Sequence, residues 1–530
     1  MVATVHLALL RGRRGAAQRR GLAMNAISVA TGRTVGPPQL QDVAGEQLRE
    51  RCQDAIGAGG RLQMAYAWYP QGTKDVPEVR YLVHPGAAPL QIWRCRPRTP
   101  RLPSLAGIAP LLSWYEREIT DLCGLHFEDA PQPEPLVLLP GAQLSAFPLE
   151  PGSEAQMRYT PIPPTLPEMS GRRPEDVQVL PWGPIRADVL ESAQFDYYYI
   201  GEAILHYHPQ LFFKHRGMEK RFEGITPDLG AILAERVSGV GSVAHSLAYC
   251  QAIEAAAGCA VPARARWMRV LLAELERLYN HFHYFGHLSH TTTLKVGDAE
   301  GKLLEERVKQ VNAVVTGHRL LRGLLIPGGL RREPKLAGIG EILRPIREEA
   351  LRYTAMLEAT TTHLDRLITT GVLPRRVAFD QGATGPVERA SGLDRDLRRD
   401  QPYAAYGEVP IQITVKDAGD AHARQQVRIA ETVQIFDIIE QVLAEVPEGP
   451  LRSPCDPPPG SEGLGWSESP RGSLYYAAHI DQSGHLARVK IKSPSFSNWR
   501  VFPYTVHDSN MMDYAINEAS FGLTIAGADR

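Results

Sequence analysis

The chain has 530 residues, of which 43% are hydrophobic and 22% charged, and a formal net charge of −1. This length predicts two or more domains, and the composition is that of a globular protein. The balanced charge excludes a strongly basic protein and gives no sign of a nucleic-acid partner or of a polybasic membrane patch. No run of about 18 apolar residues occurs, so we expect no membrane-spanning helix.

Six cysteines are scattered along the chain, and none forms a Cys-x-x-Cys pair: Cys52, Cys95, Cys123, Cys250, Cys259 and Cys455. They are too few and too far apart in sequence for a disulfide framework or for an iron–sulfur ligand set. We therefore expect reduced thiols, as in a cytosolic protein.

Residues 1–26 are predicted to be a leader without regular structure. A short apolar patch there precedes a series of arginines: Arg11, Arg13, Arg14, Arg19 and Arg20. A secretory signal peptide has its charges before the apolar part, so the order is reversed. Met24 is therefore an alternative start of the protein.

Residues 27–138 are predicted to form a small α/β domain. Segments at 65–69, 81–84 and 91–96 have the alternation that is typical of strands. Residues 42–58 have helical spacing. Residues 139–181 are rich in proline, which predicts an extended, semi-rigid linker.

The segment from Trp114 to Gly124 reads Trp-Tyr-Glu-Arg-Glu-Ile-Thr-Asp-Leu-Cys-Gly. It resembles the signature of the smaller peripheral-arm subunit of respiratory complex I. The resemblance implies a docking domain without a catalytic role. The residues alone also fit an amphipathic helix whose charged side chains pair with one another.

Residues 182–530 are predicted to form the larger domain, which begins with strand-like segments at 194–200 and 203–207. Lys214 to Lys220 reads Lys-His-Arg-Gly-Met-Glu-Lys. It resembles the His-Arg-Gly-x-Glu-Lys element that hydrogenases and complex I share. The resemblance makes Glu219 a candidate magnesium ligand, and the alternative is a surface glutamate at the start of a helix.

A long helix is predicted to open at Pro227, with Asp228 as its N-cap. The run from Glu235 to Ser246, Glu-Arg-Val-Ser-Gly-Val-Gly-Ser-Val-Ala-His-Ser, falls inside this helical pattern. Glycine in a helix interior costs roughly 0.5–1 kcal/mol relative to alanine. We therefore expect the backbone at this run to approach another body closely.

This run resembles the first metal-binding motif of the large subunit of energy-converting NiFe hydrogenases, Glu-Arg-Ile-Cys-Gly-Ile-Cys-Ser-Val-Ala-His-Ser. The end of the chain resembles the second motif, Cys-x-x-Cys-Thr-Asp-Arg. The four cysteines of the family are replaced by Ser238, Gly241, Thr524 and Gly527. Nickel in such a site needs soft thiolate ligands. The resemblance therefore implies a hydrogenase-like scaffold without the metal centre, and we expect no hydrogenase activity.

Further helices are predicted at 263–288, 300–321 and 345–368 from apolar residues at spacings of three and four. Four histidines gather near the end of the first of these helices: His281, His283, His287 and His290. They are either metal ligands or polar groups at a helix C-terminus, where the dipole favours positive charge. No cysteine or carboxylate completes a ligand set at a suitable spacing, which favours the second interpretation.

The candidate catalytic residues are Glu219, His245 and Arg471. In hydrogenases the arginine that corresponds to Arg471, in a Pro-Arg-Gly element, approaches the diatomic ligands of the iron. The alternative for His245 is a purely structural histidine. A further set on one helix face, either a site element or an intrahelical salt-bridge ladder, consists of Arg424, Arg428 and Glu431.

The resemblance covers about residues 27–530 and implies an α+β protein, with a small α/β docking domain followed by a mainly α-helical hydrogenase-like domain with peripheral strands. It implies a subunit of a complex I-like or formate hydrogenlyase-type oxidoreductase, peripheral on the cytoplasmic face of the cell membrane. The implied partners are an iron–sulfur small subunit and antiporter-like membrane subunits, and NAD would bind only to a distant partner.

The resemblance leaves two functions open. The first is electron transfer toward a quinone-like acceptor, as in the related quinone-site subunit of complex I. The family's quinone-contacting histidine and tyrosine are missing, because their positions fall near Leu190 and at Gly239. The second is a non-redox scaffold or coupling subunit.

Overall fold

The structure is a computed structural model that describes residues 29–30, 36–70, 76–86, 88–162, 176–186, 191–507 and 509–530. The predicted leader, residues 1–26, lies outside the described residues. So do residues 163–175 of the predicted linker and residues 187–190, which include Leu190.

The N-terminal part is built on a four-stranded sheet in the order β2-β5-β4-β3, in which β2 and β5 are parallel and the other neighbours antiparallel. The strands are β2 (Gln39–Asp42), β3 (Arg61–Trp68), β4 (Glu78–His84) and β5 (Gln91–Cys95). The three predicted strands are thus confirmed. The predicted helix at 42–58 begins later, as a 3-10 turn at Gly45–Gln47 followed by α2 (Leu48–Gly57).

The segment with the complex I-like signature forms the helix α3 (Ser113–Cys123), which ends at Gly124 in the left-handed conformation that glycine favours (φ 71°). Short strands surround it: β6 (Arg101–Pro103) pairs with β7 (His126–Glu128), and β8 (Ala142–Leu144) pairs with β9 (Met157–Tyr159). The proline-rich segment therefore carries a small hairpin.

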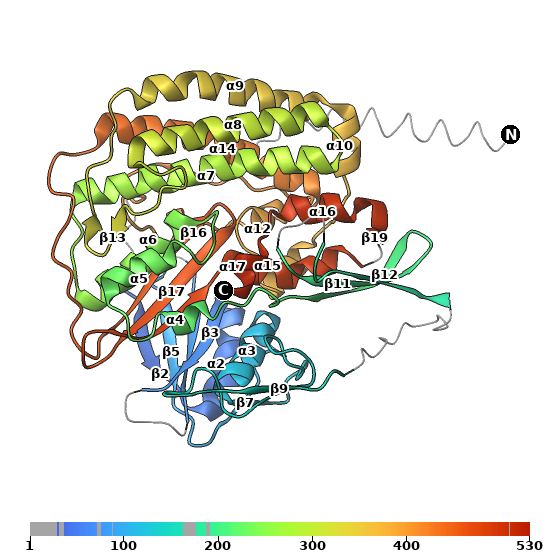
Figure 1. Ribbon diagram of the computed structural model, residues 1–530, viewed down its shortest axis with the longest axis vertical. Coiled ribbons are helices and arrows are strands. Elements are labelled where there is room, and N and C mark those ends of the chain that lie inside the picture. The colour runs from blue at the N-terminus through green and yellow to red at the C-terminus, as the bar shows by residue number, and fades with distance from the viewer. Residues whose placement is uncertain are drawn as a thin grey trace.

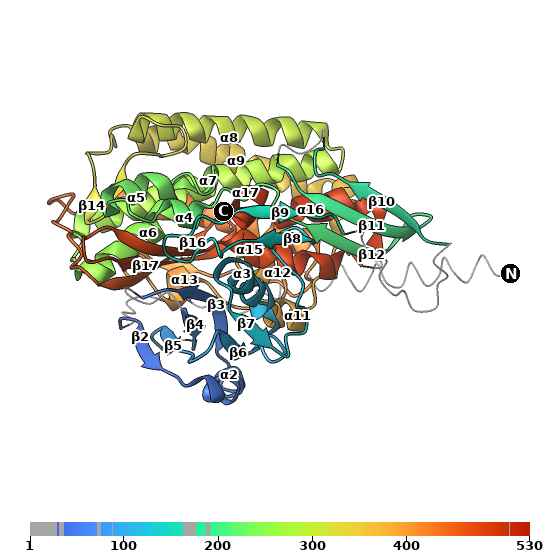
Figure 2. The ribbon, with the colours of Figure 1, turned by 60° about the horizontal axis from the view of Figure 1, so that its bottom comes forward.

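A second sheet, in the order β10-β11-β12-β19, extends away from the body of the molecule (Figure 2). Its strands are β10 (Gln178–Trp182), β11 (Gln194–Ile200), β12 (Ala203–Gln210) and β19 (Ser509–Asn510). The strands predicted at 194–200 and 203–207 are confirmed. A minor pairing joins β1 (Val29–Ala30) to β15 (Ile411–Gln412).

The long helix predicted from Asp228 through the glycine-bearing run is wrong. The chain forms α4 (Met218–Arg221), α5 (Pro227–Ala234) and, after a break, α6 (Ser242–Ala257). The N-cap of α5 is Thr226 rather than Asp228, and Gly241 is the N-cap of α6. Two glycines and a serine within Ser238–Gly241 disfavour helix, so the run forms the turn between two helices.

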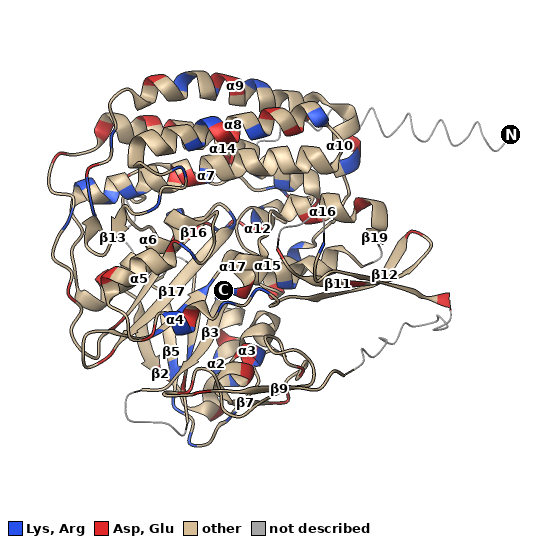
Figure 3. Cartoon of the chain, in the orientation of Figure 1, with Lys and Arg blue, Asp and Glu red and all other residues tan. Residues whose placement is uncertain are grey.

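Four long helices form a bundle at one end of the molecule (Figure 1). They are α7 (Ala263–Thr291), α8 (Lys295–Thr316), α9 (Ile339–Ala359) and α14 (Ala421–Glu445). The helix predicted at 345–368 is split at Thr360 into α9 and α10 (Thr361–Leu367). Acidic and basic residues alternate along α8 and α9 (Figure 3).

A three-stranded antiparallel sheet lies between the bundle and the N-terminal part (Figure 1). Its strands are β16 (Glu462–Ser469), β17 (Gly472–Ile480) and β18 (Leu486–Lys492). Helix α6 packs directly on β16. The two backbones approach so closely that a Cβ on Gly465 would lie 2.1 Å from the carbonyl oxygen of Ala248. Every residue of β17 is buried, so this sheet is an internal layer.

The remaining short elements connect these layers. They are β13 (Leu325–Ile326), β14 (Gly329–Leu330), α11 (Arg375–Asp380), α12 (Pro386–Ala390), α13 (Leu397–Asp400), α15 (Pro494–Val501), α16 (Tyr514–Phe521) and α17 (Ile525–Asp529). The end of the chain lies at the centre of the molecule (Figure 1). Within the described ranges, no helix is both long and apolar enough to cross a bilayer.

Candidate functional site

The first motif, Glu235 to Ser246, forms the turn that leads into α6. Within this turn, the Gly241 amide donates to the carbonyl of Ser238 (3.1 Å). The first amides of α6 are satisfied from the bundle, since Val243 N–H and Ala244 N–H donate to the carboxylate of Glu276 (2.6 and 2.9 Å). Burial raises the pKa of Glu276 to about 7, and these two hydrogen bonds oppose that rise.

The second motif, Thr524 to Arg530, forms the short helix α17. The Thr524 hydroxyl is its N-cap and accepts a hydrogen bond from Gly527 N–H (3.2 Å). The same hydroxyl lies 3.1 Å from the Ser495 hydroxyl. The Glu191 carboxylate accepts from the amides of Ile525 and Ala526.

Arg216 joins the two motifs. Its guanidinium donates to the carbonyls of Arg236 (3.0 Å) and Val237 in the first motif and to the carbonyl of Ala526 (3.1 Å) in the second. The turn before α6 and the start of α17 are therefore neighbours, although they lie about 290 residues apart in the chain. We call this region, the first motif together with Thr524–Gly527, the vacated centre.

The four former ligand positions do not fit a nickel–iron group. Two offer hydroxyls and two offer no side chain, whereas nickel in such sites takes thiolates. A Cβ on Gly527 would lie 2.5 Å from Thr524 Oγ1, and a Cβ on Gly241 would lie 3.2 Å from the His245 ring. Side chains already present thus fill the space next to both glycines.

Two predicted candidates lie here: His245 is a buried member of the vacated centre, and Arg471 is half-buried beside it. The Nδ1 atom of His245 is 2.8 Å from the Tyr476 hydroxyl. Burial, and then the charges of Arg216 and Arg471, lower the pKa of His245 to about 3, so this imidazole is neutral. Arg471 donates to the carbonyl of Gly522 and to the side chain of Asn280, each at 2.7 Å.

Glu219, the third candidate, lies in a separate group of buried charges. Its carboxylate pairs with Arg488 (2.7 Å), Lys490 (3.1 Å) and Arg530 (3.2 Å). Burial opposes ionisation of Glu219, but these three cations outweigh it and hold its pKa far below the usual range. They also compete with any divalent ion for the carboxylate, so the magnesium assignment stays a prediction.

Glu118 of α3 enters the same group from the N-terminal part. It pairs with Lys490 (2.7 Å) and with Arg530 (2.8 Å). We call Glu118, Glu219, Arg488, Lys490 and Arg530 the junction cluster, because it ties α3 to β18 and to the end of the second motif. The other charged residues of α3 also make tertiary contacts, since Arg117 donates to the carbonyls of Glu134 and Pro135.

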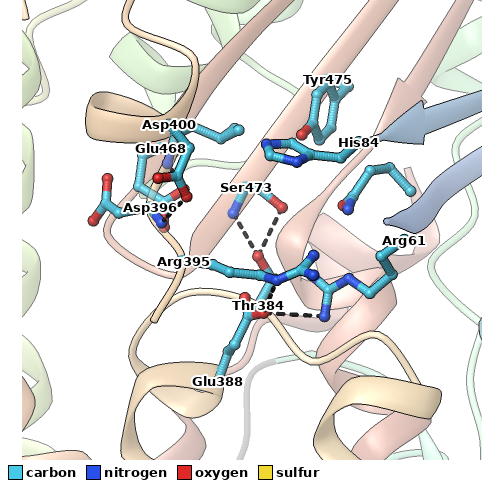
Figure 4. Close-up of a pocket in the computed structure, with 12 residues that line it drawn as sticks. Arg61, His84, Thr384, Glu388, Arg395, Asp396, Asp400, Glu468, Ser473 and Tyr475 are labelled. Carbon is cyan, nitrogen blue, oxygen red and sulfur yellow. Dashed lines mark hydrogen bonds and ion pairs between the residues drawn. The ribbon is translucent and has the colours of Figure 1, made fainter. Parts of the chain in front are cut away.

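A small polar cavity of about 20 Å³, the space of a single water molecule, lies at the same junction between β3, β4 and the larger part (Figure 4). The guanidinium groups of Arg61 and Arg395 face each other there above Glu388 (Figure 4), and Arg61 pairs with Glu388 at 3.0 Å. Burial, and then the charge of Arg61, lower the pKa of Arg395 to about 10. The contact between the N-terminal part and the larger part therefore holds two groups of charged residues: the junction cluster and the residues around this cavity.

Three of the four clustered histidines pair with different carboxylates, and the rings of His283 and His287 stack with their centroids 6.2 Å apart. His281 is buried against Glu431 (2.8 Å), while His283 pairs with Glu305 and His290 with Asp298. Across the described ranges, no group of three or more His, Cys, Asp or Glu side chains is arranged to hold a metal ion.

The helix face with Arg424, Arg428 and Glu431 is not an intrahelical ladder. Glu431 pairs with Arg389, and Arg424 and Arg428 donate to carbonyls of other segments, among them Gly371 and Phe521. These side chains cross-link α14 to its neighbours.

Sequence reasoning missed several residues that contact the vacated centre: Glu191, Arg216, Glu276, Asn280, Tyr476 and Ser495. Arg216 had a signal, because it stands in the quoted Lys-His-Arg-Gly element. Ser495 had one as well, because Lys492 to Phe496 resembles a family element. The remaining four come from segments without a motif, and only the fold brings them to the centre.

Comparisons with known proteins agree with this arrangement. Residues 60–156 match the family of the respiratory-chain NADH dehydrogenase 30 Kd subunit, residues 216–301 the nickel-dependent hydrogenases, and residues 303–458 and 453–530 the respiratory-chain NADH dehydrogenase 49 Kd subunit. The fold and these matches define a hydrogenase-related large subunit that is preceded by a complex I 30 Kd-like domain.

Formate hydrogenlyase subunit 5 of Escherichia coli is 30% identical over 440 residues, covering 81% of this chain and 77% of that protein. The C/D subunit of the NADH-quinone oxidoreductase of Rhodopseudomonas palustris is 27% identical and covers 81% and 82%. A chain in the structure of the membrane-bound sulfane sulfur reductase, an archaeal respiratory membrane complex, superposes with a TM-score of 0.64 at 26% identity, covering 67% of this chain and 99% of that one. The chain belongs to the family of formate hydrogenlyase subunit 5 and the related complex I-like large subunits.

Proposed function

We propose that this chain is a metal-free coupling subunit of a membrane-associated, complex I-like oxidoreductase. Its partners in this proposal are an iron–sulfur small subunit and antiporter-like membrane subunits, and it lies on the cytoplasmic face of the membrane. The names of its relatives support the assembly, since they are subunits of formate hydrogenlyase and of NADH-quinone oxidoreductase.

The observation that carries the proposal is the closure of the vacated centre by hydroxyl, guanidinium and backbone groups, none of which is a thiolate. The Thr524 hydroxyl occupies the space beside Gly527 and is held by Ser495, and Arg216 draws the two motifs together through backbone carbonyls. Such contacts stabilise a packed joint between segments. The chain would therefore pass conformational changes from one partner to another. It would carry out no redox chemistry at the vacated centre.

A second candidate function is reduction of a quinone-like acceptor at the vacated centre. Three side chains that can donate or share hydrogen bonds lie there: the buried His245 and the half-buried Arg216 and Arg471. A quinone headgroup needs such donors at its two carbonyl oxygens.

The test is purification of the native complex from membranes through a tag on this chain. The coupling proposal expects an iron–sulfur subunit and membrane subunits in equal amounts with this chain, and no quinone released by solvent extraction. The tagged chain alone, without partners, would contradict the assembly. Stoichiometric quinone that is lost in Arg471→Lys, but retained in the surface control Arg347→Lys, would establish the second candidate instead.

A further inference from the structure

Two thiols far apart in the sequence lie side by side on the far end of α6 from the vacated centre. Cys259 follows Gly258, the C-cap of α6, and Cys455 lies in the segment that follows α14. The Cys259 thiol donates to the carbonyl of Pro454 (3.3 Å), which belongs to the peptide bond of Cys455. This contact brings the Cys259 thiol to the peptide group that leads into Cys455.

The backbone around this thiol pair is held in place on both sides. The Ser453 hydroxyl donates to the carbonyl of Ala260 (2.9 Å), one residue after Cys259. Ser453 N–H donates to the carbonyl of Gly328 (3.0 Å), and a Cβ on Gly328 would lie 2.2 Å from the Ser453 carbonyl oxygen. The segment with Cys455 is therefore packed between the β13–β14 turn and the end of α6, so the proximity of the two thiols is built into the fold.

The two thiols differ in access to solvent. Cys259 is partly exposed, whereas Cys455 is 8% exposed. Burial, and then the neighbouring Cys259 thiol, raise the pKa of Cys455. Cys259 is thus the thiol that an oxidant in solution reaches first, and Cys455 is the thiol placed to react with the product. The nearby Cys250 is fully buried.

We propose that Cys259 and Cys455 are a thiol modification site that a low-molecular-weight disulfide converts into an internal disulfide. The Cys259 thiolate attacks one sulfur of the disulfide, forms a mixed disulfide and releases one thiolate. The Cys455 thiol gives its proton to the released thiolate and attacks the Cys259 sulfur, which releases the second thiolate. The two protein thiols are oxidised by two electrons, the reagent is reduced to two thiols, and the two protein protons appear on the released thiols.

The consequence is a covalent tie between the end of α6 and the segment that follows α14. In a reducing compartment such a bond is transient, so it forms only while the protein is exposed to an oxidant. It would fix the helix that begins at Gly241 in the vacated centre. The inference stands independently of the proposed function, since it needs only these two segments.

The experiment treats the native complex with oxidised glutathione and analyses the peptides by mass spectrometry without reduction. The wild type is expected to show a Cys259–Cys455 cross-linked peptide and no retained glutathione adduct. Cys455→Ser is expected to keep one glutathione on Cys259, because the resolving thiol is gone, and Cys259→Ser is expected to show neither product. Cys250→Ser serves as the control and should behave as the wild type.

Two results would overturn the proposal. One is a wild-type protein that retains the glutathione adduct on Cys259 as fully as Cys455→Ser does. The other is a wild-type protein in which both thiols stay free after treatment while a denatured sample reacts at every cysteine. Addition of a dithiol reductant should return the cross-linked wild type to two free thiols.

Discussion

The vacated centre and the junction cluster lie at opposite ends of one short helix, α17, and are built differently. At the first end, the Thr524 and Ser495 hydroxyls close the space beside Gly527, and Arg216 and Glu191 bind backbone groups of the motifs. At the other end, Arg530 pairs with Glu118 and Glu219 in a fully buried group of charges. At the vacated centre the charged side chains bind backbone groups, whereas in the junction cluster they pair with one another.

This difference indicates where the fold depends on single residues. Neutral hydrogen bonds contribute roughly 0.5–1.5 kcal/mol each, while removal of one partner from a buried ion pair costs about 3–5 kcal/mol. The junction cluster should therefore be the sensitive end of α17. Three substitutions test this contrast, and their expected effects decrease in the order in which they follow.

Glu118→Gln should be the most damaging of these changes. It leaves Lys490, Arg488 and Arg530 with Glu219 as their only carboxylate in the junction cluster, so the free energy of unfolding should fall by about 3–5 kcal/mol. Urea denaturation of the purified protein measures this. Glu223→Gln, in the surface pair with Lys220, is the control and should cost at most about 1 kcal/mol. Equal losses in the two variants would refute the contrast.

Gly527→Ala should destabilise the vacated centre by about 1–3 kcal/mol, because the new Cβ would overlap the Thr524 hydroxyl. In a Thr524→Ala background the same change should cost clearly less, since the overlapping atom is removed. A double-mutant cycle by denaturation should therefore give a coupling energy on the order of 1 kcal/mol. Strictly additive effects would show that the space beside Gly527 is open.

His245 should make the stability depend on pH in a defined direction. Its pKa is about 3 in the folded chain and near 6.5 when unfolded, so the unfolded state binds the proton more tightly. Its contribution is complete above pH 6.5 and declines as the pH falls toward 3. Between pH 7 and pH 5 this amounts to about 2 kcal/mol. His245→Asn should show a correspondingly shallower loss, and identical pH profiles for the variant and the wild type would contradict the assignment.

Much of the local structure follows from the sequence, because periodicity reports local preference. The strands at 65–69, 81–84 and 194–200 and the helix at 263–288 lie where alternation and three–four spacing predict them. The helix through Ser238 and Gly241 is the main error. Apolar spacing continues through that run, but its glycines and serine favour a turn, and that local cost prevailed.

The contacts of the site were harder to predict. Glu118 and Arg530 are 412 positions apart and Arg216 and Ala526 are 310 apart, so no spacing rule connects them. The motif resemblance placed the two halves of the vacated centre together, because both come from one family site. It could not reveal that Thr524 and Ser495 would fill the space that the cysteines left.

The decisive measurement for the vacated centre is the metal content of the native complex, purified through a tag on this chain and normalised to the amount of the chain. A closed, thiolate-free centre predicts iron from an iron–sulfur partner and nickel well below one atom per chain. Stoichiometric nickel in the wild-type complex would contradict the closed centre, because none of the side chains at Ser238, Gly241, Thr524 and Gly527 is a thiolate.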